Sequence, residues 1–420
     1  MRAEVKGDAA TLNLGTIIHN QGRQAEDCRV HRQILDAAGR TVESVASASQ
    51  DLAKDSTATF KASATLAKPS LWSPETPTLY SAIVSVESGG KRHDAEEVTF
   101  GVRTLDFDAD RGFFLNGKRT EVKGTCNHQN HAGVGAALPD RLQWYRLAVL
   151  KGMGSNAVRT SHNPTPEWVE ACDRMGMMML CETRQMSSND DGMAQLEVMI
   201  KRYRNSPSII LWSMGNEEGI LQSTDQGERV MATIVQRSHE LDPTRRCTAA
   251  VNGNYGQGIS KSLDVEGFNY NLGKADAYNK ARPKQPLIGS ETASTVSTRG
   301  IYITDSLRNW VSAYDVNHPS WAELAEDWWP FYAAREWLAS GFGPDLTIAA
   351  NQHLTAGPRL AHNSALWVRV AFPRTTFATT RPGGVLNWCC ISFPTGTGSN
   401  AKANPSPSGC TRTSMKWNYF

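Results

Sequence analysis

The sequence has no long apolar run and no excess of charge of either sign. It contains no stretch of 18 consecutive apolar residues, so we expect no membrane-spanning helix. Its 44 basic and 42 acidic residues give a net charge of +2, which provides no basic surface for nucleic acid or an anionic membrane. The charge balance fits an uncharged ligand, and we expect neither a nucleic-acid partner nor a membrane partner.

The eight cysteines have neither the spacing of a disulfide framework nor that of a zinc ribbon. We interpret them as buried or incidental thiols, at Cys28, Cys126, Cys172, Cys181, Cys247, Cys389, Cys390 and Cys410. The first fifteen residues mix charged and polar side chains and contain no secretory signal. Because this start also resembles the interior of a longer protein, the sequence leaves the compartment open, and it leaves the oligomeric state open as well.

Residues 1–103 have the pattern of short β-strands. Apolar residues alternate around Leu12 and Leu14 and again over 80–86, and a Gly-Gly pair at 89–90 supplies a hairpin turn. Short alternating strands with frequent turns over about 100 residues are typical of a β-sandwich. We therefore expect this part of the chain to form one.

Residues 104–340 change to an alternation of strands and helices. An Asn-Gly pair at 116–117 marks a hairpin, and seven short strand candidates separated by helical stretches follow it. These candidates begin at residues 121, 156, 177, 209, 248, 265 and 287. Repeated strand–helix units form a parallel sheet with right-handed crossovers, and a (β/α)8 barrel of roughly 250 residues accommodates this number.

Two of the intervening helices have clear signals. Residues 139–153 are predicted to form a helix with Leu142, Tyr145 and Val149 on one face. The next helix has the expected terminal residues, which are an N-cap at Thr165, a first-turn proline at Pro166 and a terminating glycine at Gly176. Residues 341–420 differ from the rest of the chain. They contain one acidic residue, Asp345, against seven basic ones, and their apolar residues follow neither the strand nor the helix periodicity. This last segment is predicted to be irregular.

Two of the strand candidates end in a glutamate. One is 206–217 (SPSIILWSMGNE), which ends at Asn216 and Glu217, and the other is 286–291 (PLIGSE), which ends at Glu291. The carboxyl ends of barrel strands form the active face of such a fold. Two carboxyl groups there fit glycoside hydrolysis, and a separation of about 5–5.5 Å would give a retaining mechanism. The alternative for each residue is a surface glutamate that follows a strand.

The sequence resembles glycoside hydrolase family 2, the family of β-galactosidases, β-glucuronidases and β-mannosidases, over about residues 1–340. The resemblance is carried by 71–80 (LWSPETPTLY), 100–104 (FGVRT), 156–164 (NAVRTSHNP), 212–217 (WSMGNE) and 289–291 (GSE). It implies an immunoglobulin-like β-sandwich over 1–103 followed by a catalytic TIM barrel over 104–340. Segments 125–129 (TCNHQ) and 289–295 (GSETAST) are most similar to the bacterial β-galactosidase-like branch.

The resemblance also implies roles for individual residues. Glu217 would be the general acid/base and Glu291 the nucleophile, with Arg159 near Glu291 to keep that carboxylate ionised. The implied substrate-binding residues are His128, His162, Asn216, Tyr270 and Arg159. Of these, Asn216 would contact the sugar 2-hydroxyl and Tyr270 would hydrogen-bond the nucleophile. Each histidine and Tyr270 could instead be structural.

Glu182 and a group of three histidines leave alternatives open. Glu182 ends a strand and resembles a family carboxylate, but Cys181 precedes it where the family has aspartate, so its role is undecided. His128, His131 and His162 could suggest a metal cluster, but the surrounding pattern of a zinc site is absent. We expect no metal and no cofactor.

The sequence departs from the family at both ends. The resemblance includes no counterpart of the family's separate amino-terminal sandwich, and it stops near Gly341. Read one base earlier, codons for the segment after residue 343 can encode the motif that follows the family's eighth strand. We therefore hypothesise a frameshift near residue 343, which resequencing the gene tests. A barrel without its eighth strand would have two unpaired edges, so we expect weak or absent activity.

The leading functional hypothesis is a retaining hydrolase of terminal β-galactosides that acts by double displacement. One alternative is a β-glucuronidase or β-mannosidase of the same family. A second alternative is a non-catalytic remnant that binds carbohydrate. Sugar binding without turnover would separate the last alternative from the first two.

Overall fold

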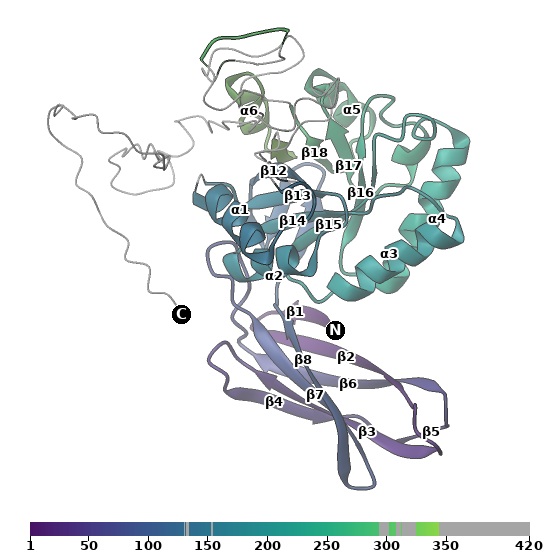
Figure 1. Cartoon of the computed structure of the whole chain (residues 1–420). Coiled ribbons are helices and arrows are strands. Elements are labelled where there is room, and N and C mark those ends of the chain that lie inside the picture. Colours follow the sequence, from purple (N-terminus) through teal and green to yellow (C-terminus); the bar gives the residue numbers. More distant parts are fainter. Residues whose placement is uncertain are drawn as a thin grey trace, which may run out of the picture. The chain divides into compact units, whose positions relative to one another are not determined.

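The structure is a computed structural model that describes residues 1–129, 131, 134–152, 154–293, 302–307, 312 and 325–343. Antiparallel sheets formed by the first hundred residues precede a closed parallel barrel, coloured purple and then teal to green in Figure 1. This confirms the expected β-sandwich followed by a (β/α)8 barrel. In the described part of the chain, no helix has the length and apolarity needed to cross a membrane. Residues 344–420, on which the frameshift hypothesis depends, lie outside the described residues.

Two antiparallel sheets form the sandwich. The first contains β1 (Arg2–Lys6), β2 (Ala9–His19) and β6 (Thr57–Ala67). The second contains β4 (Thr41–Ala46), β3 (Glu26–Leu35), β7 (Tyr80–Ser88) and β8 (Lys91–Phe100), with β5 (Gln50–Leu52) paired to β3. The predicted turn at 89–90 connects β7 and β8, and both of its glycines have positive φ, which residues with a side chain rarely adopt.

The sandwich core consists of alternate residues from both sheets. Along β2, Leu12 and Leu14 are buried while Asn13 and Gly15 are exposed, which is the period of two expected for a half-buried strand. Ile34 of β3 and Ala82 of β7, from the other sheet, belong to the same apolar cluster. The alternation in the sequence therefore marks the inner face of each sheet.

A small sheet of β9 (Leu105–Asp108), β10 (Gly112–Leu115) and β11 (Lys118–Arg119) precedes the barrel. The predicted turn at 116–117 connects β10 and β11, with both residues at positive φ. Phe107 and Phe113 have ring centroids 4.6 Å apart, and they share an apolar cluster with Trp72 and with Val122 of the first barrel strand. This sheet therefore packs against residues at the amino-terminal ends of the barrel strands.

Eight parallel strands form a closed barrel in chain order. They are β12 (Val122–His128), β13 (Ala157–Ser161), β14 (Met178–Glu182), β15 (Ile209–Asn216), β16 (Arg246–Val251), β17 (Glu266–Asn269), β18 (Leu287–Glu291) and β19 (Leu338–Gly343). The connections contain α1 (Asp140–Gly152), α2 (Pro166–Met175), α3 (Asp190–Tyr203), α4 (Asp225–Leu241), η1 (Gly258–Lys261), η2 (Leu272–Lys274), α5 (Ala275–Ala281) and α6 (Ala325–Ala333). The first seven strands coincide with the seven candidates found in the sequence.

The expectation that the barrel lacks its last strand is wrong. β19 pairs with β12 on one side and with β18 on the other, so the barrel is closed. Its sequence, LASGFG, contains two glycines and no β-branched residue, and therefore has little intrinsic preference for a strand. Pairing on both edges and burial of all six residues decide its conformation instead.

Helix α1 forms where the sequence predicted it, but it buries a different face. The buried residues are Gln143, Arg146, Leu147 and Leu150, whereas Tyr145 of the predicted face is 45% exposed. Arg146 is buried because its guanidinium lies over the Trp168 ring and donates to the His128 carbonyl. The predicted ends of α2 are confirmed, with a capping hydrogen bond from the Trp168 amide to Thr165 and a left-handed residue at Gly176.

We predict that Gly124→Ala destabilises the barrel by about 1–3 kcal/mol, as overpacking of a core does. A Cβ at Gly124 would lie 2.3 Å from the Phe342 ring, at the contact between β12 and β19. Gly15→Ala in β2 is the matched control, because its Cβ would meet only Thr59 at 3.8 Å. Urea unfolding followed by circular dichroism measures both variants. Equal stability of the two would show that β19 does not close the barrel.

Candidate active site

Polar side chains gather at the carboxyl ends of seven consecutive barrel strands. The strand order places these ends around one rim of the barrel, where active sites of this fold form. The side chains concerned are His128 at the end of β12, His162 after β13, Glu182 on β14, Asn216 and Glu217 at the end of β15, Asn252 after β16, Asn269 and Tyr270 at the end of β17, and Glu291 on β18. All seven residues singled out from the sequence lie on this rim or, for Arg159, on β13 beneath it.

Arg159 is the fully buried cation of the site, with 0% exposure. Its Nε and Nη2 donate to the two oxygens of Glu182, each at 3.0 Å. Nη2 also donates to Asn216 Oδ1 at 2.7 Å, and Nη1 donates to Glu291 Oε2 at 3.0 Å and to the Ser290 carbonyl at 3.2 Å. The five N–H groups of the guanidinium are therefore all engaged. Arg159 thus connects β13 with β14, β15 and β18.

Glu291 lies in surroundings that keep it ionised. Its Oε1 accepts a 2.7 Å hydrogen bond from Tyr270, and its Oε2 accepts from Arg159. Burial by itself would raise the pKa of this carboxyl group. The charge of Arg159 and the hydrogen bonds from Tyr270 and Arg159 outweigh burial, with a smaller contribution from His128, so the pKa is lowered.

Glu217 lies in surroundings of the opposite kind. Burial raises the pKa of its carboxyl group and the charge of Glu291 raises it further, against hydrogen bonds from Asn269 and Asn252 and the charge of Arg159. The backbone of Glu217 is left-handed, with φ 51°, and that of Tyr270 is too, with φ 56°. Residues with side chains adopt this conformation at some energetic cost, and such residues cluster at functional sites.

Asn269 is a site residue that the sequence reasoning did not identify. Its Nδ2 lies 2.9 Å from Glu217 Oε1 and 3.2 Å from Glu291 Oε2, and also 3.0 Å from Asn216 Oδ1. It occupies the strand end directly before Tyr270, as Asn216 does before Glu217. That repeated pattern of a buried strand followed by asparagine and a second polar residue is the signal that could have found it.

Glu182 is fully buried and links Arg159 to a histidine. Besides the two bonds from Arg159, it accepts a 2.8 Å hydrogen bond from Ser213 Oγ, and His162 Nδ1 lies 2.8 Å from its Oε1. Glu182, whose role the sequence leaves undecided, thus neutralises the buried Arg159 and lies beside His162. Among the described residues, His128, His131 and His162 do not group into a set of metal ligands.

The grouping of potential metal ligands that does occur in the described residues is His239, Cys247 and Asp264. His239 Nε2 already lies 2.8 Å from Asp264 Oδ2, and that oxygen also accepts from the Cys247 backbone amide. Burial raises the pKa of the Cys247 thiol, which opposes formation of a thiolate. These contacts fit a hydrogen-bonded histidine–aspartate pair.

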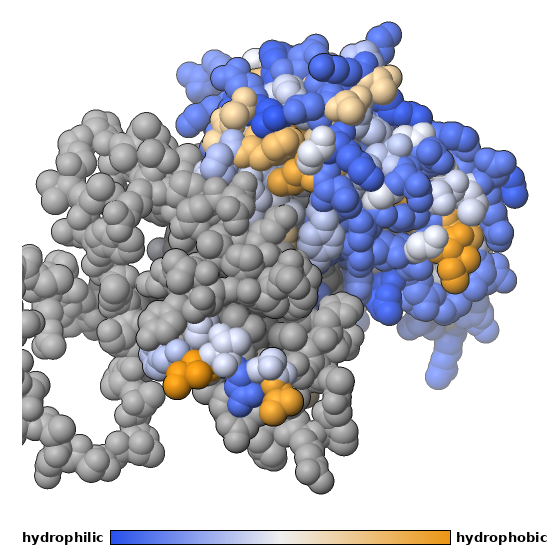
Figure 2. Space-filling view, turned by 90° about the horizontal axis from the view of Figure 1, so that it is seen from above, coloured by the Kyte–Doolittle hydropathy of each residue, from blue (hydrophilic) through white to orange (hydrophobic). Residues whose placement is uncertain are grey.

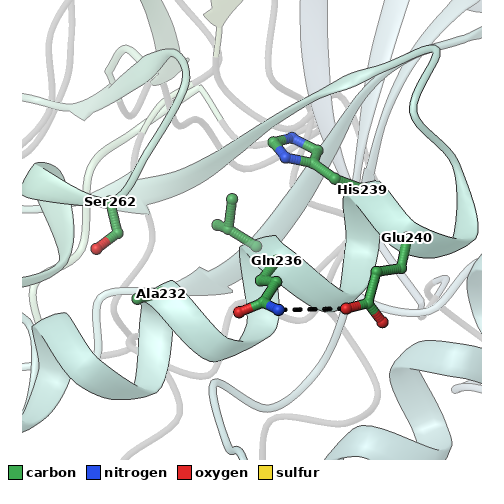
Figure 3. A pocket seen from close by; sticks show the side chains of 6 residues that line it. Ala232, Gln236, His239, Glu240 and Ser262 are labelled. Atoms are coloured by element: carbon green, nitrogen blue, oxygen red, sulfur yellow. Dashed lines mark hydrogen bonds between the residues drawn. The ribbon is translucent and has the colours of Figure 1, made fainter.

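His239 also lines an open hollow of about 640 Å³ along α4, shown in Figure 3. Gln236 and Glu240 on the same helix hydrogen-bond to one another at its edge, and Ser262 lies across from them. The lining residues come from α4 and the segment after η1, so the hollow does not contain the carboxyl groups at the strand ends. We assign no part of the chemistry to it.

The surface turned to the viewer in Figure 2 is mostly hydrophilic where its residues are described, with a few apolar patches. Ile220, in the connection after β15, is 91% exposed, and Ile303 and Leu307, in the connection after β18, are 80% and 96% exposed. Connections that follow β-strands in such a barrel lie on the active face. Exposed apolar side chains therefore lie in the same connections that follow the two glutamates.

Comparison with known families assigns both parts of the chain. The model described as glycosyl hydrolases family 2 matches residues 1–103. The model of the TIM barrel domain of the same family matches residues 109–195 and 187–315. Together these matches cover most of the chain.

Two curated proteins illustrate the relationship. The chain is 30% identical over 381 residues to the β-galactosidase BoGH2A of Bacteroides ovatus, which covers 76% of this chain and 44% of that protein. It is 34% identical over 251 residues to a putative β-glucuronidase of Formosa agariphila, which covers 57% of this chain and 23% of that protein. The chain therefore spans less than half the length of either relative.

Solved structures give the same result. A glycosyl hydrolase family 2 member from Bacteroides cellulosilyticus superposes with a TM-score of 0.69 at 26% identity, covering 82% of this chain and 43% of that one. A β-glycosidase from Bacteroides vulgatus superposes with a TM-score of 0.68 at 29% identity, covering 82% of this chain and 48% of that one. With its paired glutamates on the rim of a barrel that matches the family from residue 109 onward, this chain belongs to glycosyl hydrolase family 2.

Proposed function

We propose that the chain is the catalytic part of a retaining β-glycosidase, with Glu217 as general acid/base and Glu291 as nucleophile. The observation that carries this proposal is the closeness of the two carboxyl groups. Asn269 Nδ2 is within hydrogen-bond distance of both, at 2.9 and 3.2 Å. Their nearest oxygens are then at most about 6 Å apart, which is compatible with the carboxyl separation of roughly 5–5.5 Å in retaining enzymes.

The two pKa directions support this division of roles. A general acid must be protonated when substrate binds, and the pKa of Glu217 is raised by burial and by the charge of Glu291. A nucleophile must be ionised, and the pKa of Glu291 is lowered by Arg159 and Tyr270 in spite of burial. Two carboxyl groups whose surroundings move their pKa values apart are a general sign of paired acid and nucleophile.

In the first step, Glu291 attacks the anomeric carbon while Glu217 gives its proton to the leaving oxygen, and the glycosidic bond breaks. In the second step, Glu217 takes a proton from water, the water oxygen bonds to the anomeric carbon, and Glu291 leaves as a carboxylate. Water thereby replaces the leaving group on the same face of the sugar.

Further residues have supporting roles in this proposal. Arg159 and Tyr270 keep Glu291 ionised and oriented through their hydrogen bonds. Asn216 accepts from Arg159 and from Asn269 through its amide oxygen, which leaves the amide NH2 group as the end that can donate to the sugar 2-hydroxyl. His128, the last residue of β12, and His162, directly after β13, are proposed to contact the other hydroxyls.

The substrate that we favour is a terminal β-galactoside. A glucuronide brings a carboxylate that needs a cationic partner. Arg159, the cation bonded to Glu291, has all its donors engaged by Glu182, Glu291, Asn216 and the Ser290 carbonyl, so it has none for a sugar carboxylate. A β-glucuronide is the second candidate, because one of the two relatives above is named a putative β-glucuronidase.

We predict a covalent adduct at Glu291 after incubation with an activated 2-deoxy-2-fluoro galactoside, detected by intact-mass spectrometry and peptide mapping. Such sugars form the intermediate faster than it breaks down. Glu291→Gln should give no adduct. Glu217→Gln should still give one, because an activated leaving group needs little help from an acid. Glu240→Gln, on α4, is the matched control. Labelling by the glucuronide analogue alone would reassign the substrate, and an adduct on any other residue would contradict the proposal.

We predict that Tyr270→Phe moves the acidic limb of the kcat/KM–pH profile to higher pH and leaves the basic limb in place. The acidic limb reports ionisation of Glu291, and the hydrogen bond from Tyr270 lowers the pKa of that group. Losing the bond raises the pKa, so activity is lost as pH falls through a higher value than in the parent protein. Tyr145→Phe, at an exposed position of α1, should leave both limbs unchanged. A uniform loss of rate at every pH would argue against this role of Tyr270.

A further inference from the structure

The side chain of Asn269 is the group that contacts both proposed catalytic carboxyl groups at once. Its Nδ2 has three acceptors within 3.2 Å, which are Glu217 Oε1, Glu291 Oε2 and Asn216 Oδ1. An amide NH2 group has only two hydrogens. The three acceptors therefore share two donors, and the sharing can change when the charge on one carboxyl group changes.

A hydrogen bond from Ser290 fixes the orientation of the Asn269 amide. Ser290 Oγ donates a 2.7 Å hydrogen bond to Asn269 Oδ1, and both residues are fully buried. A flipped amide would direct Oδ1 at the two carboxyl groups and Nδ2 at a hydroxyl. Tyr255 also donates to the Asn269 carbonyl at 2.8 Å, which holds the backbone at the end of β17. The NH2 group is thereby directed toward the glutamates before substrate arrives.

In a double displacement, the negative charge alternates between the two carboxyl groups. Glu291 is ionised and Glu217 is protonated before the first step, whereas Glu291 is an ester and Glu217 is ionised in the intermediate. A donor that hydrogen-bonds an ionised carboxylate stabilises that form and lowers its pKa. One NH2 group in contact with both oxygens can stabilise whichever group is charged, without any movement of the backbone.

We propose that Asn269, oriented by Ser290, is a positioning residue that hydrogen-bonds the charged member of the Glu217–Glu291 pair in each half of the reaction and so couples their ionisation. This inference rests on the proposed retaining function. It assigns to Asn269 no contact with the sugar and no transfer of a proton. Its effect is exerted through the two glutamates, at a strand end held between β15 and β18.

Other charged or titratable groups also face this pair, and they remain present in the variants below. They are His128 from β12, Arg159 from β13, Glu182 from β14, Tyr255 from the connection after β16, and Tyr270 directly after β17. Asn269 Nδ2 is within hydrogen-bond distance of a carboxyl oxygen of each glutamate, at 2.9 and 3.2 Å. Its amide therefore links the two groups together.

The experiment compares Asn269→Ala, Asn269→Asp and Ser290→Ala with the parent protein. Asn13→Asp, at an exposed position of β2, is the matched control. Glutamate labelled with carbon-13 at its carboxyl carbon allows the pKa values of Glu217 and Glu291 to be titrated by NMR. Their signals are assigned from Glu217→Gln and Glu291→Gln. The titration is repeated after trapping with the 2-deoxy-2-fluoro galactoside, and the kcat/KM–pH profile of each variant is measured alongside.

Removing the donor should raise both pKa values in Asn269→Ala by about one unit, the scale on which a hydrogen bond to a charged carboxylate acts. Asn269→Asp should raise them further, because it adds a like charge beside both groups. Ser290→Ala should give a smaller rise in the same direction. In the kcat/KM–pH profile, the acidic limb and the basic limb should then both move to higher pH. In the trapped protein, the pKa of Glu217 should again be higher in each variant than in the parent.

The outcomes separate this inference from the proposed function. NMR pKa values of both glutamates that are unchanged in Asn269→Ala and in Ser290→Ala would overturn the coupling, whatever the turnover. A rise in the pKa of only one of the two glutamates would also overturn the proposal, because the proposal requires Asn269 to hydrogen-bond both of them. Raised pKa values in a protein with no turnover and no adduct would support the coupling and contradict the retaining hydrolase. If Asn269→Ala does not fold, Ser290→Ala and Asn269→Asp decide the result by the same criteria.

Discussion

The rest of the site depends on the contacts that compensate the buried positive charge of Arg159. A cation with 0% exposure is stable only with close counter-charges, and Glu182 supplies a bidentate one from the next strand. The remaining donors of the guanidinium then reach Asn216 and Glu291 on β15 and β18. Removing Glu182 would leave Glu291 as the remaining carboxylate bonded to Arg159, and it would also remove the carboxylate beside His162. One arginine inside the barrel therefore fixes the positions of side chains from four strands.

The same low-polarity surroundings act on the two glutamates in opposite directions because their partners differ. Burial raises the pKa of Glu217, which is hydrogen-bonded by the neutral side chains of Asn269 and Asn252, whereas Arg159 and Tyr270 overcome burial at Glu291. The left-handed backbones of Glu217 and Tyr270 also contribute to the site, since each turns a side chain inward directly after a buried strand. Closure of the barrel by β19 gives β18 a neighbour on both edges, so the strand that carries Glu291 is held on each side.

Most of the architecture could be predicted from local patterns. Alternating residues in the sandwich, the turns at 89–90 and 116–117 and the ends of α2 each depend on a few neighbouring residues, and all of them appear where expected. The eighth strand could not be predicted, because LASGFG has little strand preference and is extended only through pairing with β12 and β18. The buried face of α1 could not be predicted either, since Arg146 is buried through Trp168, a residue of the next helix.

The features of the site likewise divide into those set by local sequence and those set by tertiary contacts. By itself, the sequence determined that two apolar strands end in Glu217 and Glu291 and that Arg159, Tyr270 and two histidines stand at other strand ends, because these patterns are local and their family motifs are contiguous. Only the tertiary structure decided how near the two carboxyl groups lie, that Glu182 neutralises Arg159, and that Asn269 bonds both glutamates. The reason is physical: each of these contacts joins residues from different strands, and the distance between strand ends is set by closure of the whole barrel.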